Sequence, residues 1–386
     1  MAVLIDLTDV SVVDNHCHAL EADQVADVPR WRQLFTESPD PSMRAHDVAE
    51  TAFYRRLIRA MGMHFGVAGG EASVLEARAA LTTEELVSSM FRDAAIGAVV
   101  IDTGYPAPDK AMSAAQFRSL SRAQYAALLR LEVIFQQLIA EHTTYDDLLG
   151  AAREQLAGAR RAGFVGFKSV VAYRTGLSIE RWSVDEARTS FARAREEVER
   201  SGAVRLGYKP LLDTLLHLAF EIAAADGLPV QFHVGYGDPD ADLRTASPLE
   251  LRNVLEERAY RSMPVVLLHG CWPYVREGAY LAAVYANAYL DVSYAIPFLS
   301  RGEMLAMTRA ALAAAPFTKL MYSSDGARVP ELHWLGAHDG RRALSAALGE
   351  LVADGDLDVD EARGAGERIL QGNALRLYGF GDESPS

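Results

Sequence analysis

The sequence predicts an α/β protein built as a (β/α)8 or TIM barrel, with a helical insertion after the first strand. Eight short apolar runs occur along the 386 residues, and a segment with helical periodicity follows each of them. The runs are almost continuously apolar, as is typical of parallel strands buried on both faces. Eight strand–helix units suit one large barrel. No Gly-x-Gly-x-x-Gly follows the first run, which disfavours an open dinucleotide-binding sheet.

The elements are expected in regular order within a single domain, residues 1–386, with the helical insertion at 20–95. The predicted strands cover 11–18, 96–102, 131–135, 164–171, 228–234, 265–269, 289–293 and 320–325. The predicted helices cover 43–61, 83–95, 113–129, 143–162, 184–202, 211–225, 248–260, 275–286, 303–315, 340–353 and 359–377. The third strand is the least determined, because its residues also fit a helix over 119–142. Residues 27–41 and 62–70 are predicted loops, and the polar segment 381–386 is expected to fray.

Composition limits the partners and the compartment. Lys and Arg total 38 against 52 Asp and Glu, a formal charge of −14, which disfavours nucleic-acid and anionic-membrane partners. The only two cysteines, Cys17 and Cys271, fit a reducing cytoplasmic compartment without a disulfide. The first residues lack the basic region of a signal peptide, and no apolar run approaches the length of a membrane span.

Ligand-type side chains stand at the ends of five predicted strands. His16 and His18 are one residue apart on a strand, so they point the same way. The carboxyl ends of all barrel strands meet at one mouth, where the active site lies. The side chains expected to converge there are His16, His18, Lys168, His233, His269 and Asp325.

Imidazole and carboxylate groups are ligands for Zn²⁺, Fe²⁺ and Mn²⁺, so we expect one or two divalent metal ions at this mouth. The metal would lower the pKa of a bound water, and Asp325 would take its proton. His269 would steady the developing oxyanion or bind a second metal. Taken singly, His233 and His269 are also compatible with hydrogen-bonded core histidines, and Asp325 with an ordinary turn residue.

Lys168 is expected inside the protein, where an unpaired ammonium is costly. A neutral amine there can add CO₂ and become a carbamate that bridges two metals. An unmodified lysine paired with Asp325 or with a substrate carboxylate is the equal alternative.

Residues of the mouth loops are candidates for substrate binding, with Arg174 suited to a carboxylate. The candidates are Tyr105, Tyr173, Arg174 and Arg328, and less favoured are Trp272, Tyr294, Glu331 and His333. Loop packing is the alternative role for each. Four further histidines are expected to be structural, namely His46, His64, His142 and His217.

The six ligand-type residues match the metal-ligand positions of the amidohydrolase superfamily, which the chain resembles over nearly its whole length. Residues 166–177 and 322–326 resemble the branch that is fused to glutamine-synthetase-like domains and includes hydrolases of γ-glutamyl amides. The resemblance implies metal-dependent hydrolysis. The superfamily also contains decarboxylases, lactonases and a few oxygenases with iron-containing dinuclear sites.

We therefore expect a metal-dependent hydrolase that cleaves an amide C–N bond of a small carboxylate-bearing substrate, with a γ-glutamyl amide as the specific candidate. The alternative is an O₂-activating dinuclear iron or manganese oxygenase of small amino acids, and decarboxylation also stays open. A catalytically silent subunit is disfavoured because no ligand position is missing. The expected partners are a small-molecule substrate and further copies of the chain, or a related subunit in a hetero-oligomer.

Overall fold

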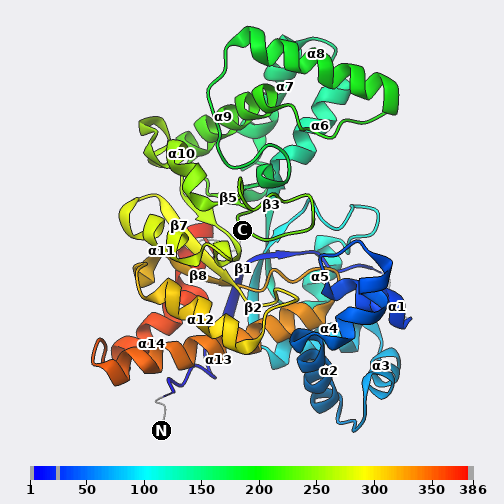
Figure 1. Cartoon of the computed structure of the whole chain (residues 1–386), viewed down its shortest axis with the longest axis vertical. Helices are drawn as coiled ribbons and strands as arrows, with labels where there is room; N and C mark the ends of the chain where they lie inside the picture. Colours follow the sequence, from blue (N-terminus) through cyan, green and yellow to red (C-terminus); the bar gives the residue numbers. More distant parts are fainter. Residues whose placement is uncertain (1–3, 23–26, 381–386) are drawn as a thin grey trace.

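The computed structural model describes residues 4–22 and 27–380, so the predicted fraying of 381–386 lies outside the described residues. Eight parallel strands form one sheet in the order β1 to β8, with helices between them, which confirms the (β/α)8 barrel (Figure 1). The strands are β1 Val12–His18, β2 Ile96–Asp102, β3 Gln124–Arg130, β4 Phe164–Ser169, β5 Val230–Phe232, β6 Val265–Leu267, β7 Ala288–Ser293 and β8 Leu320–Ser323.

The segment after β8 returns to β1 and brings the two edges of the sheet together. The Asp325 amide donates to the His16 carbonyl at 3.0 Å, and the His18 amide donates to the Gly326 carbonyl at 2.8 Å. These bonds place residues from the two ends of the barrel sheet side by side at its mouth.

The helices are α1 Val28–Arg32, α2 Ala52–Phe65, α3 Glu71–Ala79, α4 Thr83–Asp93, α5 Ala114–Ser121, α6 Leu131–Glu141, α7 Tyr145–Gly158, α8 Val184–Ser201, α9 Lys209–Asp226, α10 Arg252–Glu256, α11 Val275–Val284, α12 Arg301–Leu312, α13 Pro330–Asp354, α14 Val359–Glu367 and α15 Asn373–Tyr378. Short 3-10 and π turns extend several of them, including the π turns Met43–Asp47 and Arg368–Gly372. Among the described residues, none of these helices combines the length and the apolar character needed to cross a membrane.

The predicted third strand at 131–135 is wrong, and the helix predicted over 113–129 is confirmed only for α5 at 114–121. Residues 124–130 form β3 between β2 and β4, with Ala98 paired to Gln124 and Arg130 paired to Lys168. The apolar run that follows buries Leu131, Phe135 and Leu138, which is the spacing of one face of helix α6. Helix α5 ends at Ser121 because Arg122 adopts the left-handed conformation at φ 59°.

Two further boundaries differ from the prediction. Helix α13 begins at Pro330 rather than at 340, so Glu331 and His333 lie buried in its first two turns and not on a mouth loop. Residues 27–41, predicted as a loop, contain α1 and a 3-10 turn at Gln33–Phe35. Pro330 supplies a φ that suits the first turn of a helix, which explains the early start.

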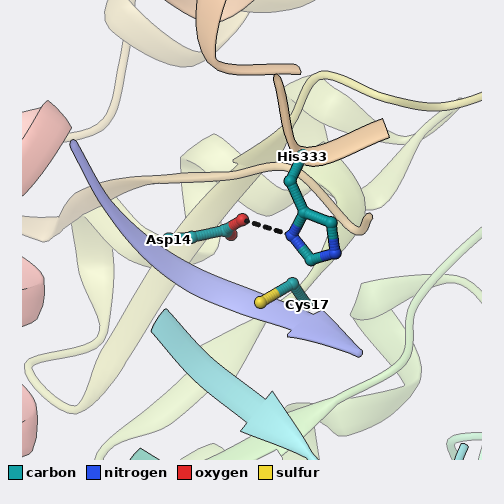
Figure 2. A group of neighbouring side chains, drawn as sticks. All are labelled: Asp14, Cys17 and His333. Carbon is teal, nitrogen blue, oxygen red and sulfur yellow. Dashed lines mark ion pairs between the residues drawn. The ribbon is translucent and has the colours of Figure 1, made fainter. Parts of the chain in front are cut away.

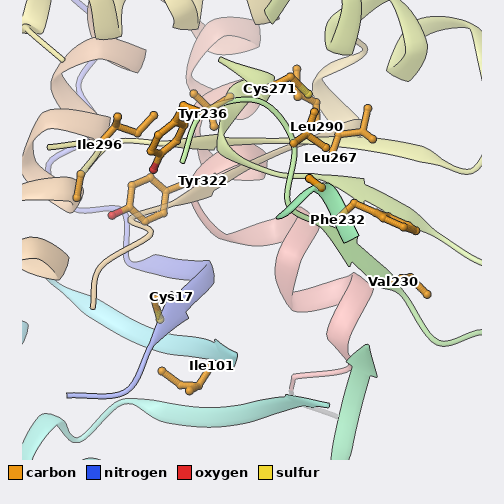
Figure 3. Packing of buried hydrophobic residues seen from close by; sticks show 14 of the residues in the cluster. Cys17, Ile101, Val230, Phe232, Tyr236, Leu267, Cys271, Leu290, Ile296 and Tyr322 are labelled. Atoms are coloured by element: carbon orange, nitrogen blue, oxygen red, sulfur yellow. The ribbon is translucent and has the colours of Figure 1, made fainter. Parts of the chain in front are cut away.

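The core has two layers, one on each face of the barrel strands. Figure 3 shows part of the outer layer, where Val230, Phe232, Leu267 and Leu290 of β5, β6 and β7 pack in one cluster. A smaller cluster on the opposite face of the strands contains Val13, Val100, Leu128, Val266 and Met321. Burial on both faces explains why the strand sequences are almost continuously apolar.

The segment between β1 and β2 contains α1 to α4 and packs beside α13 (Figure 1). Two buried ion pairs join it to that helix, Arg78 with Glu331 and Arg56 with Asp339. Breaking such a pair leaves one charge buried without compensation, which is strongly unfavourable. The helical segment is therefore held in a fixed position near the mouth.

Candidate metal centre

The Asp325 carboxylate lies close to both histidines of β1 at the mouth. The Oδ1 atom of Asp325 lies 3.4 Å from His16 Nε2 and 3.5 Å from His18 Nε2. Ligand atoms bound at about 2.1 Å to one tetrahedral ion lie about 3.4 Å apart. Asp325 has φ 57°, a left-handed conformation that Asp tolerates, and this turn brings its carboxylate back over β1.

The remaining ligand-type side chains continue from this group in a chain of contacts. His269 Nδ1 lies 3.3 Å from the Oδ2 atom of Asp325, and His269 Nε2 lies 2.8 Å from His233 Nδ1. Lys168 Nζ lies 3.5 Å from His16 Nε2. The structure thus brings all six predicted side chains together at the carboxyl ends of the strands, and their metal-binding roles stay predictions.

Burial keeps the imidazoles in the neutral form that binds metals. Burial and the nearby Lys168 lower the pKa of His16 to about 4, although Asp325 opposes the change. Burial also lowers the pKa of His233 and of His269 well below the ordinary value. These three rings are therefore neutral near pH 7 and offer free lone pairs.

The carboxylate and the lysine are shifted toward the forms that metal binding requires. Burial alone would raise the pKa of Asp325, but His269 and the hydrogen-bonded His16 and His18 hold it well below its usual range. Burial lowers the pKa of Lys168 to about 8, although the charge of Asp102 opposes the change. A neutral amine is therefore accessible at Lys168, as CO₂ addition would need.

Asp102 and Arg130 support the centre, and neither was among the predicted site residues. Arg130 Nε donates to both carboxylate oxygens of Asp102 at 2.9 Å, and Asp102 Oδ2 lies 3.9 Å from His18 Nδ1. At this distance the contact is an ion pair without a hydrogen bond, and His18 Nδ1 has no hydrogen-bond partner among the described residues. Asp102 ends a correctly predicted strand and could have been found, whereas Arg130 was hidden by the wrong third strand.

A cavity of about 340 Å³ opens above the six side chains, and the four predicted substrate contacts line it. The Tyr105 ring packs against His18, and the Tyr173 ring packs against His233. Arg328 is held by Glu21 through a hydrogen bond of 2.7 Å. Among the described residues, the Nε atom of Arg174 has no hydrogen-bond partner although it is buried, which leaves this guanidinium the most available of the four for a ligand.

The less favoured candidates lie elsewhere. Tyr294 is buried and bonds to Thr308, and the indole of Trp272 donates to Glu303. The cavity lining includes none of the four histidines expected to be structural. It does include Tyr236, Glu37 and Asp238, which the prediction missed.

The missed residues have different signals in the sequence. The Tyr236 hydroxyl donates to the Oδ2 atom of Asp325 at 2.7 Å, and Tyr236 follows His233 by three residues. Reading onward from the strand end would have found it. Glu37 comes from the segment between β1 and β2, and only the tertiary packing brings it over the mouth.

The raised pKa of Glu37 predicts how the stability of the metal-free protein depends on pH. Burial, with the nearby Asp325 and Asp238 charges, raises the pKa of Glu37 from 4.5 to about 7. Between these values the folded state keeps a proton that the unfolded state has lost, so the free energy of unfolding falls as pH rises. Glu37→Gln is expected to remove this decline, a difference of up to about 3 kcal/mol across that range.

Urea unfolding of both proteins between pH 5 and 7.5 measures the effect. Glu84→Gln, at an exposed position of α4, is the matched control and should follow the wild type at every pH. Parallel stability curves for the wild type and Glu37→Gln would show that Glu37 does not titrate in this range.

Comparison with known proteins identifies a matching family and a curated relative. The family model described as amidohydrolase matches residues 13–380. Protein fluG of Emericella nidulans is 36% identical over 232 residues, which cover 58% of this chain and 26% of that protein. The match therefore spans only about a quarter of the length of this curated relative.

Two solved structures show the same fold. A Lactobacillus casei ATCC 334 protein for which metal-dependent hydrolase activity is proposed has 29% identity and a TM-score of 0.87, covering 99% of this chain and 100% of its own. An uronate isomerase of Bacillus halodurans C-125 has 14% identity and a TM-score of 0.65, covering 96% of this chain and 94% of its own. At that identity the second likeness shows the fold alone.

Proposed function

The chain belongs to the amidohydrolase family, and on this basis we propose that it is a metal-dependent hydrolase that cleaves the amide C–N bond of a small carboxylate-bearing substrate. One observation carries the proposal. The Oδ1 atom of Asp325 lies 3.4 Å from His16 Nε2 and 3.5 Å from His18 Nε2. The neutral state of His16 and the ionised state of Asp325 suit a divalent cation.

A divalent metal bound by these residues would polarise the substrate carbonyl and lower the pKa of an attacking water. Asp325 is placed to accept the proton of that water and later to pass it to the departing amine. The Tyr236 hydroxyl donates to the Oδ2 atom of Asp325 and so orients the carboxylate for both transfers. His269, between Asp325 and His233, is placed to steady negative charge on the carbonyl oxygen or to hold a second metal.

Lys168 would supply a bridging ligand if its amine adds CO₂. The nitrogen–carbon bond forms as the amine loses a proton, and the product carries a carboxylate in place of an ammonium. The 1% exposure of Lys168 and its position 3.5 Å from His16 favour a group with ligand oxygens over a free ammonium.

The charges around the cavity support a γ-glutamyl amide as the substrate. Arg174 offers a partly buried guanidinium for a carboxylate, while Glu37 and Asp238 lie on the lining as acidic groups for an ammonium. An amino-acid head group carries both charges. The test is hydrolysis of γ-glutamyl-p-nitroanilide by metal-loaded protein. The reaction is measured through the release of nitroaniline and glutamate.

Arg174→Gln is expected to raise KM for this substrate by about 10-fold or more, because a charge-assisted bond of a partly buried guanidinium is lost. The value of kcat should change less, since the reacting carbonyl lies at the metal centre. The corresponding α-methyl ester lacks the carboxylate and should show the same KM with both proteins. Arg205→Gln, at an exposed residue paired with Asp240, is the control. An equal loss on both substrates would contradict a carboxylate contact.

A second candidate is an O₂-activating dinuclear iron or manganese oxygenase of small amino acids. Its support is the second group of donors beside Asp325, formed by Lys168, His233 and His269, since two adjacent metal positions and an imidazole–carboxylate set suit iron as well as zinc. Dependence of turnover on O₂ and a reductant separates this candidate from the hydrolase.

A further inference from the structure

A second group of metal-ligand side chains lies outside the mouth, between β1 and α13. Figure 2 shows Asp14 and Cys17 on β1 with His333 of α13 above them. One carboxylate oxygen, the Cys17 sulfur and one ring nitrogen lie within 4.8 Å of one another, and His333 Nδ1 is 3.7 Å from Asp14 Oδ2. All three side chains are fully buried.

The backbone of β1 separates this group from the candidate centre at the mouth. His16 and His18 line the substrate cavity, whereas the three residues of the second group do not. A register irregularity between Asp14 and Cys17 lets these two side chains, three positions apart, face the same neighbour. A single strand thus carries two sets of ligand atoms.

His333 is a polar residue in an apolar position. Its ring packs between Phe91 and Phe117, and a Cβ added at Gly326 would lie 2.8 Å from it. Among the described residues, neither ring nitrogen of His333 has a hydrogen-bond partner. The buried hydroxyl of Tyr322 also has none within the described part of the chain. Buried polar groups are rarely left without a partner, so such a cluster points to a ligand.

We propose that Asp14, Cys17 and His333 form a second, structural metal site that binds Zn²⁺. Thiolate, imidazole and carboxylate are the usual ligands of zinc. Two anionic ligands and one neutral ligand balance a divalent cation, which resolves the cost of burying this carboxylate among apolar groups. The fourth tetrahedral position is left for a water.

The existing hydrogen bonds are compatible with this site. Asp14 Oδ1 accepts from the Ser324 amide at 2.8 Å and Asp14 Oδ2 accepts from the Ser324 hydroxyl, and each carboxylate oxygen keeps a further lone pair for a metal. The sulfur of Cys17 makes a weak contact of 3.8 Å with the Val100 carbonyl, and its thiol also interacts with the Asp14 carboxylate. The metal would join β1 to α13 and hold Ser324, the residue before Asp325. This role goes beyond the proposed hydrolysis and does not depend on it.

Cobalt tests the site because the six candidate ligands at the mouth include no sulfur. Protein produced in zinc-free medium with Co²⁺ would take up the metal as it folds. We expect a near-ultraviolet charge-transfer band from thiolate to cobalt, with one cobalt per chain responsible for it. Cys17→Ser should lose the band, Cys271→Ser should keep it, and His333→Gln should lose one metal equivalent. A band that persists in Cys17→Ser, or no band in the wild type, would overturn the proposal.

X-ray absorption of zinc-loaded wild-type protein provides a test that needs no variant to fold. A zinc–sulfur shell at about 2.3 Å is expected beside nitrogen and oxygen at about 2.0–2.2 Å. A spectrum with nitrogen and oxygen alone would mean that the three residues form a proton-bridged cluster without a metal. The X-ray absorption result does not depend on whether the protein hydrolyses any amide.

Discussion

Asp325→Asn is expected to lower kcat/KM for γ-glutamyl-p-nitroanilide by about 10³-fold or more, with the fold retained. The change removes the negative charge that lies 3.4 and 3.5 Å from the two imidazoles of β1. It removes both a ligand of the proposed metal and the acceptor of the proton from water. General acid–base catalysis alone contributes about 10²- to 10⁴-fold, and weaker metal binding adds to the loss. Steady-state kinetics of one preparation measure the total loss of activity, and metal analysis of the same preparation measures how much metal is lost.

The matched control is Asp240→Asn, which makes the same chemical change on the cavity lining. Asp240 is ion-paired with Arg205 and half exposed, so its loss should leave kcat/KM close to the wild-type value. Comparable losses in both variants would mean that Asp325 has no special role. Circular dichroism of each variant shows whether the barrel is intact.

Lys168→Ala is expected to reduce the metal bound at the mouth to at most one ion per chain. Lys168 is buried beside His16, and a carbamate there would be the ligand shared by two metals. Short carboxylic acids such as acetate or propionate should restore part of the activity, because they supply the missing oxygen atoms. Metal analysis and kinetics with and without the acid give the two readouts.

Two controls make this result specific to the bridge. Lys209→Ala removes a lysine that pairs with Asp213, outside the cavity lining, and should change neither metal content nor the response to acids. Lys168→Met keeps the apolar length of the side chain and leaves less room for an added acid, so rescue should be weaker. Unchanged metal stoichiometry in Lys168→Ala would reject the carbamate and favour an unmodified lysine.

The fold and the convergence of the six side chains could be predicted because both follow from parallel strands. A strand buried on both faces is apolar almost throughout, and a polar residue at its end stands out, as His233 and His269 do. The carboxyl ends of such strands meet at one mouth, so six residues could be placed together without any contact information. The resemblance to the amidohydrolase superfamily is confirmed by the family match over residues 13–380.

The errors came from residues whose environment depends on distant parts of the chain. The run at 131–135 is apolar in either a strand or a helix, and only pairing of residues 124–130 with both neighbouring strands decides between them. Glu37 reaches the cavity because buried ion pairs hold the segment between β1 and β2 against α13. His333 was placed on a loop because the prediction began this helix at 340 and missed Pro330, which suits the first turn of a helix. The oligomeric state, the cytoplasmic location and the partners stay predictions.

Turnover of γ-glutamyl-p-nitroanilide under argon, before and after removal of the metal, tests the central claim most directly. The account predicts hydrolysis without O₂, its loss when a chelator strips the metal, and its return when Zn²⁺ or Mn²⁺ is added back. Undiminished hydrolysis in metal-free protein would contradict the assignment of His16, His18 and Asp325 as metal ligands. Turnover that needs iron, O₂ and a reductant would contradict the hydrolase and favour the oxygenase.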